Sequence, residues 1–116
     1  MIMETYRQVH LAVGATDMRR GIDGLALIVS ECFNLDPFSQ GMFVFCNAAM
    51  DRIKMLRWDG TGFWLYHKRL EKARFRWPQG KSEAMAVEPR ELRWLLDGLE
   101  LTQKKAHKNV SERAII

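Results

Sequence analysis

The sequence predicts one α+β domain, in which a small antiparallel sheet of four to five strands is covered by an N-terminal helix and accompanied by a short C-terminal helix. A chain of 116 residues is long enough for one compact core. Hydrophobic residues make up 47% of it and charged residues 28%, a balance typical of globular proteins. The apolar pattern changes from strand to helix, then to several strands with tight turns, and back to helix. We place the domain at residues 1–101 and expect a polar, basic tail at 102–116.

The first half is predicted to hold a strand at residues 9–13 and then one amphipathic helix. Thr16 or Asp17 can cap this helix, because a short side-chain oxygen accepts hydrogen bonds from otherwise free backbone N–H groups. The helix should end before Pro37, since proline disfavours helical geometry in the residue before it. Its apolar residues recur at helical spacing and form one stripe: Met18, Ile22, Leu25, Val29 and Cys32.

Two glycines and two arginines in this helical stretch allow two interpretations. Gly21 and Gly24 share a helix face, so they would let a strand or a second helix approach closely. Alternatively, the helix start forms an anion site in which Arg19 and Arg20 reach a phosphate group. The carboxylate of Asp17 argues against a bare anion pocket there.

The second half is predicted to be mostly strand. Residues 43–46 form a continuous apolar run, typical of a strand buried on both faces. Residues 52–58 and 63–68 have the composition of two strands, joined by a turn at 59–62 whose Asp and Gly residues tolerate positive φ angles. Residues 75–77 are a further strand candidate.

A second helix is predicted to begin at Pro89 and to stop at Gly98. Trp94 lies off its leucine stripe, beside Arg90 and Arg93, and an exposed Trp next to Arg is typical of a protein interface. Burial of Trp94 in the domain is the alternative. The leucines that would face the domain are Leu92, Leu95, Leu96 and Leu99.

The cysteines and the apolar runs indicate a cytoplasmic protein. Cys32 and Cys46 make no disulfide framework and lack C-x-x-C spacing. The longest apolar runs are far shorter than the roughly 20 residues that a membrane span needs. No basic-then-apolar leader opens the chain.

Catalytic and metal-binding motifs are missing from the sequence. His10, His67 and His107 have no His or Cys at metal-ligand spacing, and no nucleophile elbow or phosphate-binding loop occurs. We therefore expect no catalytic residue, no metal and no cofactor. A metal-dependent nuclease is kept as an alternative. The carboxylates that would serve it are Asp17, Asp23 and Asp59.

Positive charge is concentrated in the middle of the chain. The net charge is +4, but residues 52–77 hold eight Lys and Arg against two acidic residues, with aromatic residues interleaved. Cations neutralise phosphates and rings stack on bases, so this segment predicts a nucleic-acid surface. A solvated sheet face, on which Lys and Arg prevent edge pairing, is the alternative. The phosphate candidates are Arg52, Lys54, Arg57, Lys68, Arg69, Arg74 and Arg76, with Trp58, Trp64 and Trp77 as stacking, interface or core candidates.

Strand alternation makes a prediction for residues 52–58. Arg52 and Lys54 should lie on one face, which must be wet because unpaired charge is not buried. Leu56 and Trp58 follow on the same face, so the strand should pass from solvent into the core.

Several motifs across residues 9–99 resemble one known family. They are T-D-M-R-R-G-I-D-G-L at 16–25, D-P-F-S at 36–39, W-D-G-T-G-F-W-L at 58–65, K-R-L-E at 68–71 and L-L-D-G at 95–98. In this order they are similar to the accessory protein encoded by the second open reading frame of the bacterial insertion-sequence family numbered sixty-six, also called its TnpB-type protein. Where that family usually carries Arg or Lys before Arg52, this chain reads N-A-A-M-D.

The resemblance implies a non-enzymatic role in DNA transposition, because in such elements a larger protein carries the acidic catalytic triad. It also implies element DNA, the transposase and companion element-encoded proteins as partners. A protein-only adaptor that docks on the transposase, and a homo-oligomer, stay open.

Overall fold

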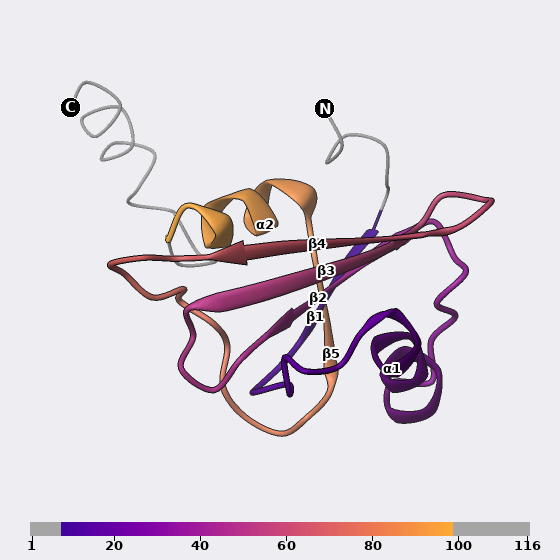
Figure 1. Cartoon of the computed structure of the whole chain (residues 1–116), viewed down its shortest axis with the longest axis horizontal. Coiled ribbons are helices and arrows are strands. Elements are labelled where there is room, and N and C mark those ends of the chain that lie inside the picture. The colour runs from indigo at the N-terminus through magenta and orange to yellow at the C-terminus, as the bar shows by residue number, and fades with distance from the viewer. Residues whose placement is uncertain (1–7, 99–116) are drawn as a thin grey trace.

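The centre of the molecule is a five-stranded sheet with the strand order β4-β3-β2-β1-β5 (Figure 1). A computed structural model describes residues 8–98; the predicted tail at 102–116 lies outside them. The strands are β1 (Gln8–Ala12), β2 (Gly41–Cys46), β3 (Arg52–Trp58), β4 (Phe63–Arg69) and β5 (Ala84–Val87). The helices are α1 (Ile22–Leu27), which continues as the π-helix η2 (Ile28–Cys32), and α2 (Pro89–Leu96).

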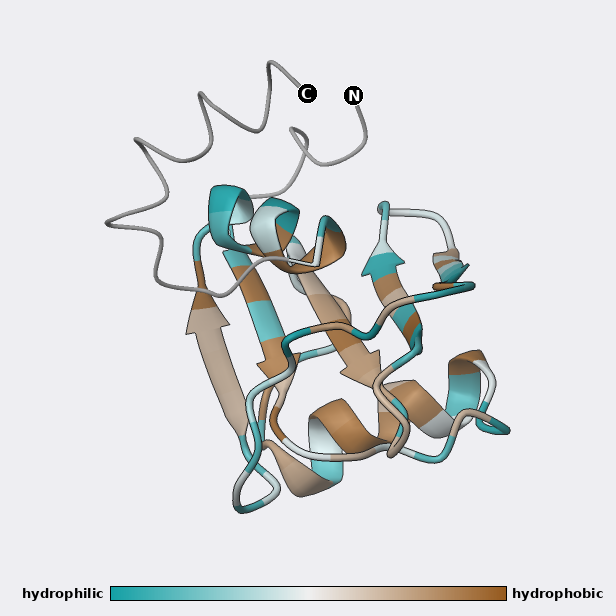
Figure 2. Ribbon diagram, turned by 90° about the vertical axis from the view of Figure 1, so that its left-hand side faces the viewer, coloured by the Kyte–Doolittle hydropathy of each residue, from teal (hydrophilic) through white to brown (hydrophobic). Residues whose placement is uncertain are grey.

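The helices lie on opposite faces of the sheet, α1 and η2 below it and α2 above it in Figure 1, and Figure 2 shows the same layers from the side. We call the two faces the α1 face and the α2 face. The α+β fold class is confirmed. No helix among residues 8–98 is long and apolar enough to cross a membrane.

The sheet is mixed, which corrects the expectation of a purely antiparallel one. β1 and β2 run parallel, with Gln8 opposite Gly41. The pairs β1–β5, β2–β3 and β3–β4 are antiparallel. A parallel pair needs a long crossover connection, and the stretch that contains α1 and η2 supplies it.

The fifth strand is formed by Ala84–Val87, and the predicted strand at residues 75–77 was wrong. Phe75 and Trp77 are buried, 2% and 4% exposed, but they fill the core from an irregular segment. The Trp77 indole Nε1 donates to the carbonyl oxygen of Ala12 at 2.9 Å, and the Phe75 N–H donates to that of Met50 at 2.7 Å. The alternation of buried and exposed residues there reflects core packing without strand pairing.

The first helix begins at Ile22, later than Thr16 or Asp17. The Asp17 carboxylate accepts hydrogen bonds from the backbone N–H and the guanidinium of Arg19, so it closes a local turn instead of capping a helix. At its end the helix widens, with the Phe33 N–H donating to the Ile28 carbonyl oxygen at 3.1 Å. This wider turn leaves Cys32 exposed, although Leu25 and Val29 are buried as the stripe predicted.

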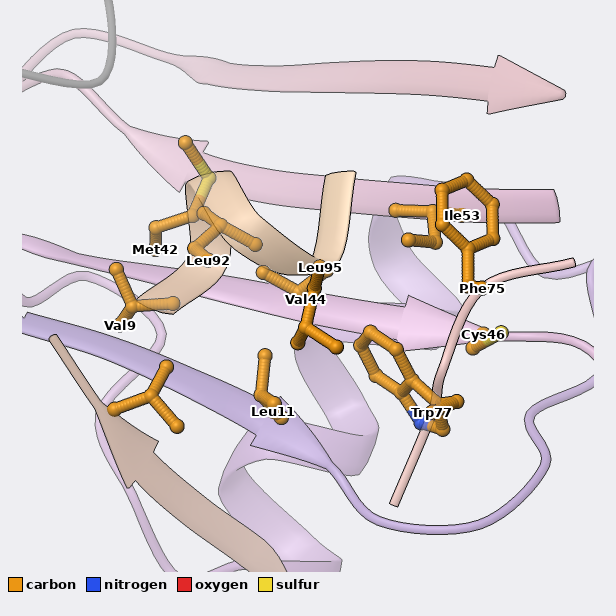
Figure 3. Close-up of a cluster of buried hydrophobic side chains, with 11 residues drawn as sticks. Val9, Leu11, Met42, Val44, Cys46, Ile53, Phe75, Trp77, Leu92 and Leu95 are labelled. Carbon is orange, nitrogen blue, oxygen red and sulfur yellow. The ribbon is translucent and has the colours of Figure 1, made fainter. Parts of the chain in front are cut away.

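Each face of the sheet has its own hydrophobic cluster. On the α1 face, Leu25 and Val29 pack on Phe43, Phe45 and Leu56. The other cluster lies on the α2 face, where Figure 3 shows side chains of α2, of β1 to β3 and of the segment after β4 together. Every residue of β2 is buried, as expected for a strand covered on both faces. The labelled members of the α2-face cluster are Val9, Leu11, Met42, Val44, Cys46, Ile53, Phe75, Trp77, Leu92 and Leu95.

The second helix begins at Pro89 as predicted and ends at Leu96, just before the predicted stop at Gly98; Leu99 lies outside the described residues. Glu88 and Glu91 form a capping box, in which the Glu88 N–H donates to Glu91 Oε1 at 2.8 Å, and Pro89 follows the cap. The chain leaves the helix at Gly98, whose φ of +81° favours glycine. Leu92 and Leu95 are fully buried, so packing against the sheet determines where this short helix lies.

Two helical leucines test this packing. Leu95→Ala should lower the free energy of unfolding by about 2–5 kcal/mol, because Leu95 is 0% exposed and its removal leaves a cavity. Leu27→Ala is the matched control: Leu27 is 54% exposed, and a change of at most about 0.5 kcal/mol is expected. Urea denaturation measures both, and equal losses would contradict the placement of α2.

Candidate nucleic-acid interface

The register between β3 and β4 sets basic side chains opposite one another. Arg52 is paired with Arg69, and Lys54 with His67. Residues two apart on a strand point to the same side, so all four lie on one face. It is the α1 face, because Leu56 follows in the same alternation and packs against α1. We call Arg52, Lys54, His67 and Arg69 the basic end.

The basic end lies where α1 does not cover the sheet. In Figure 1 it is at the left, at the start of β3 and the finish of β4, whereas α1 lies under the right half. Arg52, His67 and Arg69 are exposed, and together with Glu71 they line an open hollow of about 400 Å³. The predicted passage of β3 from solvent into the core is confirmed.

Positive charge exceeds negative charge in this hollow. Glu71 is its acidic residue, and its Oε2 lies 2.9 Å from Arg69 Nε. Both side chains are more than half exposed, so this ion pair contributes little to stability. Arg52 and Arg69 are cations directly opposite one another on the sheet, and their repulsion makes this pair a local cost to folding.

Lys54 differs from its neighbours because its ammonium group is already bonded. Its Nζ donates to the carbonyl oxygens of Met18, at 2.6 Å, and of Arg20, at 3.0 Å. These bonds hold the loop before α1 against β3 and bring the Arg20 backbone to the border of the basic end. Lys54 therefore acts as a positioning residue in addition to carrying charge.

Gly21 and Gly24 were expected to let a strand or a second helix approach closely, but the structure gives them other roles. A Cβ on Gly24 would lie 3.2 Å from Cβ of Arg20, so Gly24 makes room for the Arg20 side chain and not for a strand or a second helix. Gly21 has no heavy atom within 4 Å of such a Cβ. It precedes the helix as its N-cap, where its conformation is extended.

Arg52 is oriented by the turn before it. The Asn47 side-chain oxygen accepts the backbone N–H groups of Asp51 and Arg52, both at 3.0 Å. The Asn47 amide nitrogen donates to the Asp51 carboxylate at 2.7 Å. Residues 47–51, where the resembling family usually carries cations, thus form a tightly bonded turn that leads into the basic end.

The other predicted cations lie elsewhere. Arg57 and Lys68 point to the α2 face, because strand alternation separates them from Arg52 and Arg69. Arg57 Nε is buried without a hydrogen-bond partner among residues 8–98, and Lys68 Nζ donates to the Leu96 carbonyl oxygen at 2.9 Å. Arg19 is bound to Asp17 at 2.8 Å. Arg74 and Arg76 are exposed and alternate with the buried Phe75 and Trp77.

The tryptophans that alternate with cations in the sequence do not lie among them in space. Trp77 belongs to the core, and Trp58, at the far end of β3, packs edge-on against Phe63 with 5.0 Å between ring centroids. Trp64 is 51% exposed but lies on the α2 face. Trp94 is half-buried on α2, with the Arg90 guanidinium 5.8 Å from its ring. The basic end therefore contains none of the four tryptophans.

Of the acids proposed for a nuclease, Asp17 and Asp59 are engaged in other interactions, and Asp23 is exposed in the first turn of α1. The side-chain hydrogen bond from Arg19 lowers the pKa of Asp17 to about 2. Asp59 holds the β3–β4 turn: its carboxylate accepts the N–H groups of Thr61 and Gly62 and the Trp64 indole, and these bonds lower its pKa to about 2. Among residues 8–98 no three His, Cys, Asp or Glu side chains are grouped as metal ligands.

His67 is the member of the basic end that sequence reasoning missed. In the sequence His67 is a candidate only as a metal ligand, and it has no partner at the right spacing for that role. The sequence feature that could have identified it is its position two residues before Arg69, because residues two apart on a strand point to the same face.

The role of Lys54 can be separated from that of Arg52 by stability. Lys54→Met should lower the free energy of unfolding by about 2 kcal/mol, because the Met18 and Arg20 carbonyl groups lose a charged donor. Arg52→Met, on the same strand and face, should change it by at most about 0.5 kcal/mol. Thermal or urea denaturation distinguishes them, and equal effects would contradict a positioning role for Lys54.

The turn at Asp59 predicts a pH dependence. Its folded pKa of about 2 lies below the ordinary value of 3.8, so ionised Asp59 stabilises the fold above about pH 4. This stabilisation is lost as the pH falls from about 4 towards 2. The NMR signal of the Trp64 indole N–H should follow the same titration, with a midpoint near 2. A midpoint near 4 would show that the bonds to Asp59 do not persist in solution.

Comparison with known proteins reveals relatives for nearly the whole described chain. The family IS66 Orf2 like protein (TnpB_IS66) matches residues 7–106. The uncharacterized protein y4hO of Sinorhizobium fredii is 40% identical over 93 residues, which cover 80% of this chain and 81% of the relative. The uncharacterized protein y4jC of the same organism is 35% identical over 98 residues, 84% of each chain. No solved structure matches the chain. The chain therefore belongs to the IS66 Orf2 like family, which identifies it as an accessory protein of transposition.

Proposed function

We propose that this transposition accessory protein contacts the phosphate backbone of element DNA through the basic end. The observation that carries the proposal is the pairing of Arg52 with Arg69 and of Lys54 with His67 on a sheet face that α1 leaves open. Repulsion between Arg52 and Arg69 is a cost that a bound polyanion removes, because each phosphate neutralises the cations beside it.

The dimensions of the basic end suit a nucleic-acid backbone. Paired residues on neighbouring strands have Cβ atoms about 5 Å apart, and the two pairs are separated by about 7 Å along the strands. On this scale the three cations Arg52, Lys54 and Arg69, with the His67 imidazole beside them, can contact neighbouring phosphates of one strand. The exposed Arg19, Arg20, Arg74 and Arg76 are candidates for contacts farther along the backbone.

The proposed contact is independent of base sequence. Sequence is read by hydrogen bonds to base edges or by rings that stack on unpaired bases. The basic end has cations with long side chains and no Trp, Tyr or Phe, its one ring being the His67 imidazole, so it suits phosphates of duplex DNA more than splayed-out bases. Arg57 and Lys68 point away from it, and we assign them no phosphate contact in this proposal.

A role without catalysis of its own completes the proposal. The acids closest to a nuclease pattern are engaged elsewhere: Asp17 binds Arg19, and Asp59 holds the β3–β4 turn. In this view the protein positions element DNA for an enzyme that another element-encoded protein supplies. A protein-only adaptor that docks through Trp94 is the competing account, and DNA binding distinguishes the two.

Binding to a fluorescent duplex, measured by anisotropy at several salt concentrations, tests the proposal. About four phosphate contacts should make the affinity fall by about a hundredfold between 50 and 200 mM salt. The double change Arg52→Ala and Arg69→Ala should weaken binding and reduce the salt slope by about two. Duplexes with and without element ends should bind alike.

Arg93→Ala provides the matched control, because Arg93 is an exposed cation on α2, on the opposite face. It should leave the salt slope within about 0.5 of the wild-type value. A salt-independent affinity, or an Arg52 and Arg69 variant that binds like the wild type, would refute the phosphate contact.

A further inference from the structure

We propose that the far end of the β3–β4 hairpin is a docking surface for a protein partner, one that offers an apolar groove flanked by Lys or Arg. The surface, which we call the hairpin tip, comprises residues 36–40 and 58–64. It lies at the right of Figure 1, where the turn between β3 and β4 meets the loop that leads into β2. The residues that form this surface do not take part in the proposed DNA contact. Only the choice of the partner in the test below rests on the proposed function.

The hairpin tip gathers exposed aromatic rings. Four large hydrophobic side chains are exposed among residues 8–98, and two of them, Phe38 at 56% and Trp64 at 51%, are here. The Phe38 ring packs on Trp58 and Phe63, with centroid distances of 5.0 and 5.3 Å. Isolated exposed hydrophobics need no explanation, but rings that gather at one end of a molecule are typical of a protein contact.

The two exposed rings flank the hairpin. Phe63 and Trp64 are consecutive in β4, so they point to opposite faces. Phe38 adjoins Phe63 on the α1 face, and Trp64 lies on the α2 face. A partner that covers both rings must therefore enclose the hairpin tip in a groove and not meet it as a flat surface.

Both rings are held in place before any partner binds. The Trp64 indole Nε1 donates to Asp59 Oδ2 at 2.7 Å, and its ring lies parallel to Tyr66, 6.1 Å away and inclined by 6°. The Phe38 N–H donates to Asp36 Oδ1 at 2.9 Å, which fixes the loop that carries it. Rings that are already ordered lose little conformational entropy on binding, which is how a small surface gains affinity.

Charge decides between a protein and DNA at this end. The hairpin tip contains Asp36 and Asp59 and no Lys or Arg, with Arg57 at its border. Two carboxylates repel a phosphate backbone, whereas Lys or Arg at the rim of a protein groove would complement them. The aromatic rings would supply the buried centre of that contact.

The two ends of the hairpin are far enough apart to bind DNA and a protein partner at the same time. Strands of seven residues place the hairpin tip about 20 Å from the basic end. A partner at the hairpin tip would therefore not cover Arg52 or Arg69. One rigid hairpin could thus link element DNA to a protein of the same transposition machinery.

The test is binding to the purified transposase of the same element, treated with nuclease and measured by calorimetry. The double change Phe38→Ser and Trp64→Ser should weaken binding at least tenfold and leave the affinity for duplex DNA unchanged. Asp36→Asn keeps the acceptor for the Phe38 N–H but removes the charge. It should therefore retain the fold, lower the affinity two- to fivefold and reduce its salt dependence.

Leu27→Ser is the matched control, since Leu27 is a 54% exposed hydrophobic residue on α1, outside the hairpin tip. It should leave the affinity for the transposase unchanged. The proposal is overturned if the wild type does not bind the transposase, if the tip variants bind as tightly as the wild type, or if Leu27→Ser weakens binding equally. Wild-type dimers that the double variant abolishes would assign the surface to a second copy and also overturn it. Failure of DNA binding alone would affect only the proposed phosphate contact.

Discussion

The register between β3 and β4 is the constraint on which both proposed surfaces depend. With Arg52 opposite Arg69 and Trp58 opposite Phe63, one hairpin has cations at one end and aromatic rings at the other. A slip of one residue would send Arg52 and Lys54 to the α2 face and leave Leu56 without contact to α1. The buried positions of Ile53 on one face and Leu56 on the other oppose such a slip, since both are 0% exposed.

Two features adapt this hairpin to its surroundings. The regular helix is short and lies under one half of the sheet, so Arg52, His67 and Arg69 at the other half of β3 and β4 stay exposed on the α1 face. Lys54 then ties the loop before α1 to β3, which uses a cation to satisfy two backbone carbonyl groups where no helix is formed. The open face and the bonded loop together account for cations in a strand that elsewhere packs into the core.

Local patterns predicted the parts of the fold that local interactions determine. The limits of β3 and the turn at Asp59 follow from alternation and turn residues, and α2 follows from its Pro89 start and Gly98 stop. The late start of α1 could not be predicted in this way, because Lys54, more than 30 residues away, binds the carbonyl groups of Met18 and Arg20. β5 was missed because two of its four residues are alanine, which favours strands weakly.

The candidate site was predicted in composition but not in arrangement. The sequence pointed to residues 52–77 as cationic and aromatic, and strand alternation correctly put Arg52 and Lys54 on one side. The register with β4 determines which of its cations share that face. Arg69 lies on the same face as Arg52 and Lys54, whereas Lys68 lies on the other face and binds the end of α2. In the sequence Trp77 cannot be told from the other aromatic residues of this segment. In the structure it is buried in the core, where its indole N–H donates to the Ala12 carbonyl oxygen. Such separations depend on pairing between strands, which a single sequence shows only after the register is known.

The most direct test of the central claim is an NMR titration of the labelled protein with a short DNA duplex. The account predicts that backbone and side-chain signals of Arg52, His67 and Arg69 shift together as DNA is added, while those of Phe38 and Trp64 at the hairpin tip and of Leu92 on α2 stay in place. Shifts centred on α2 or on the hairpin tip, with an unchanged basic end, would contradict it.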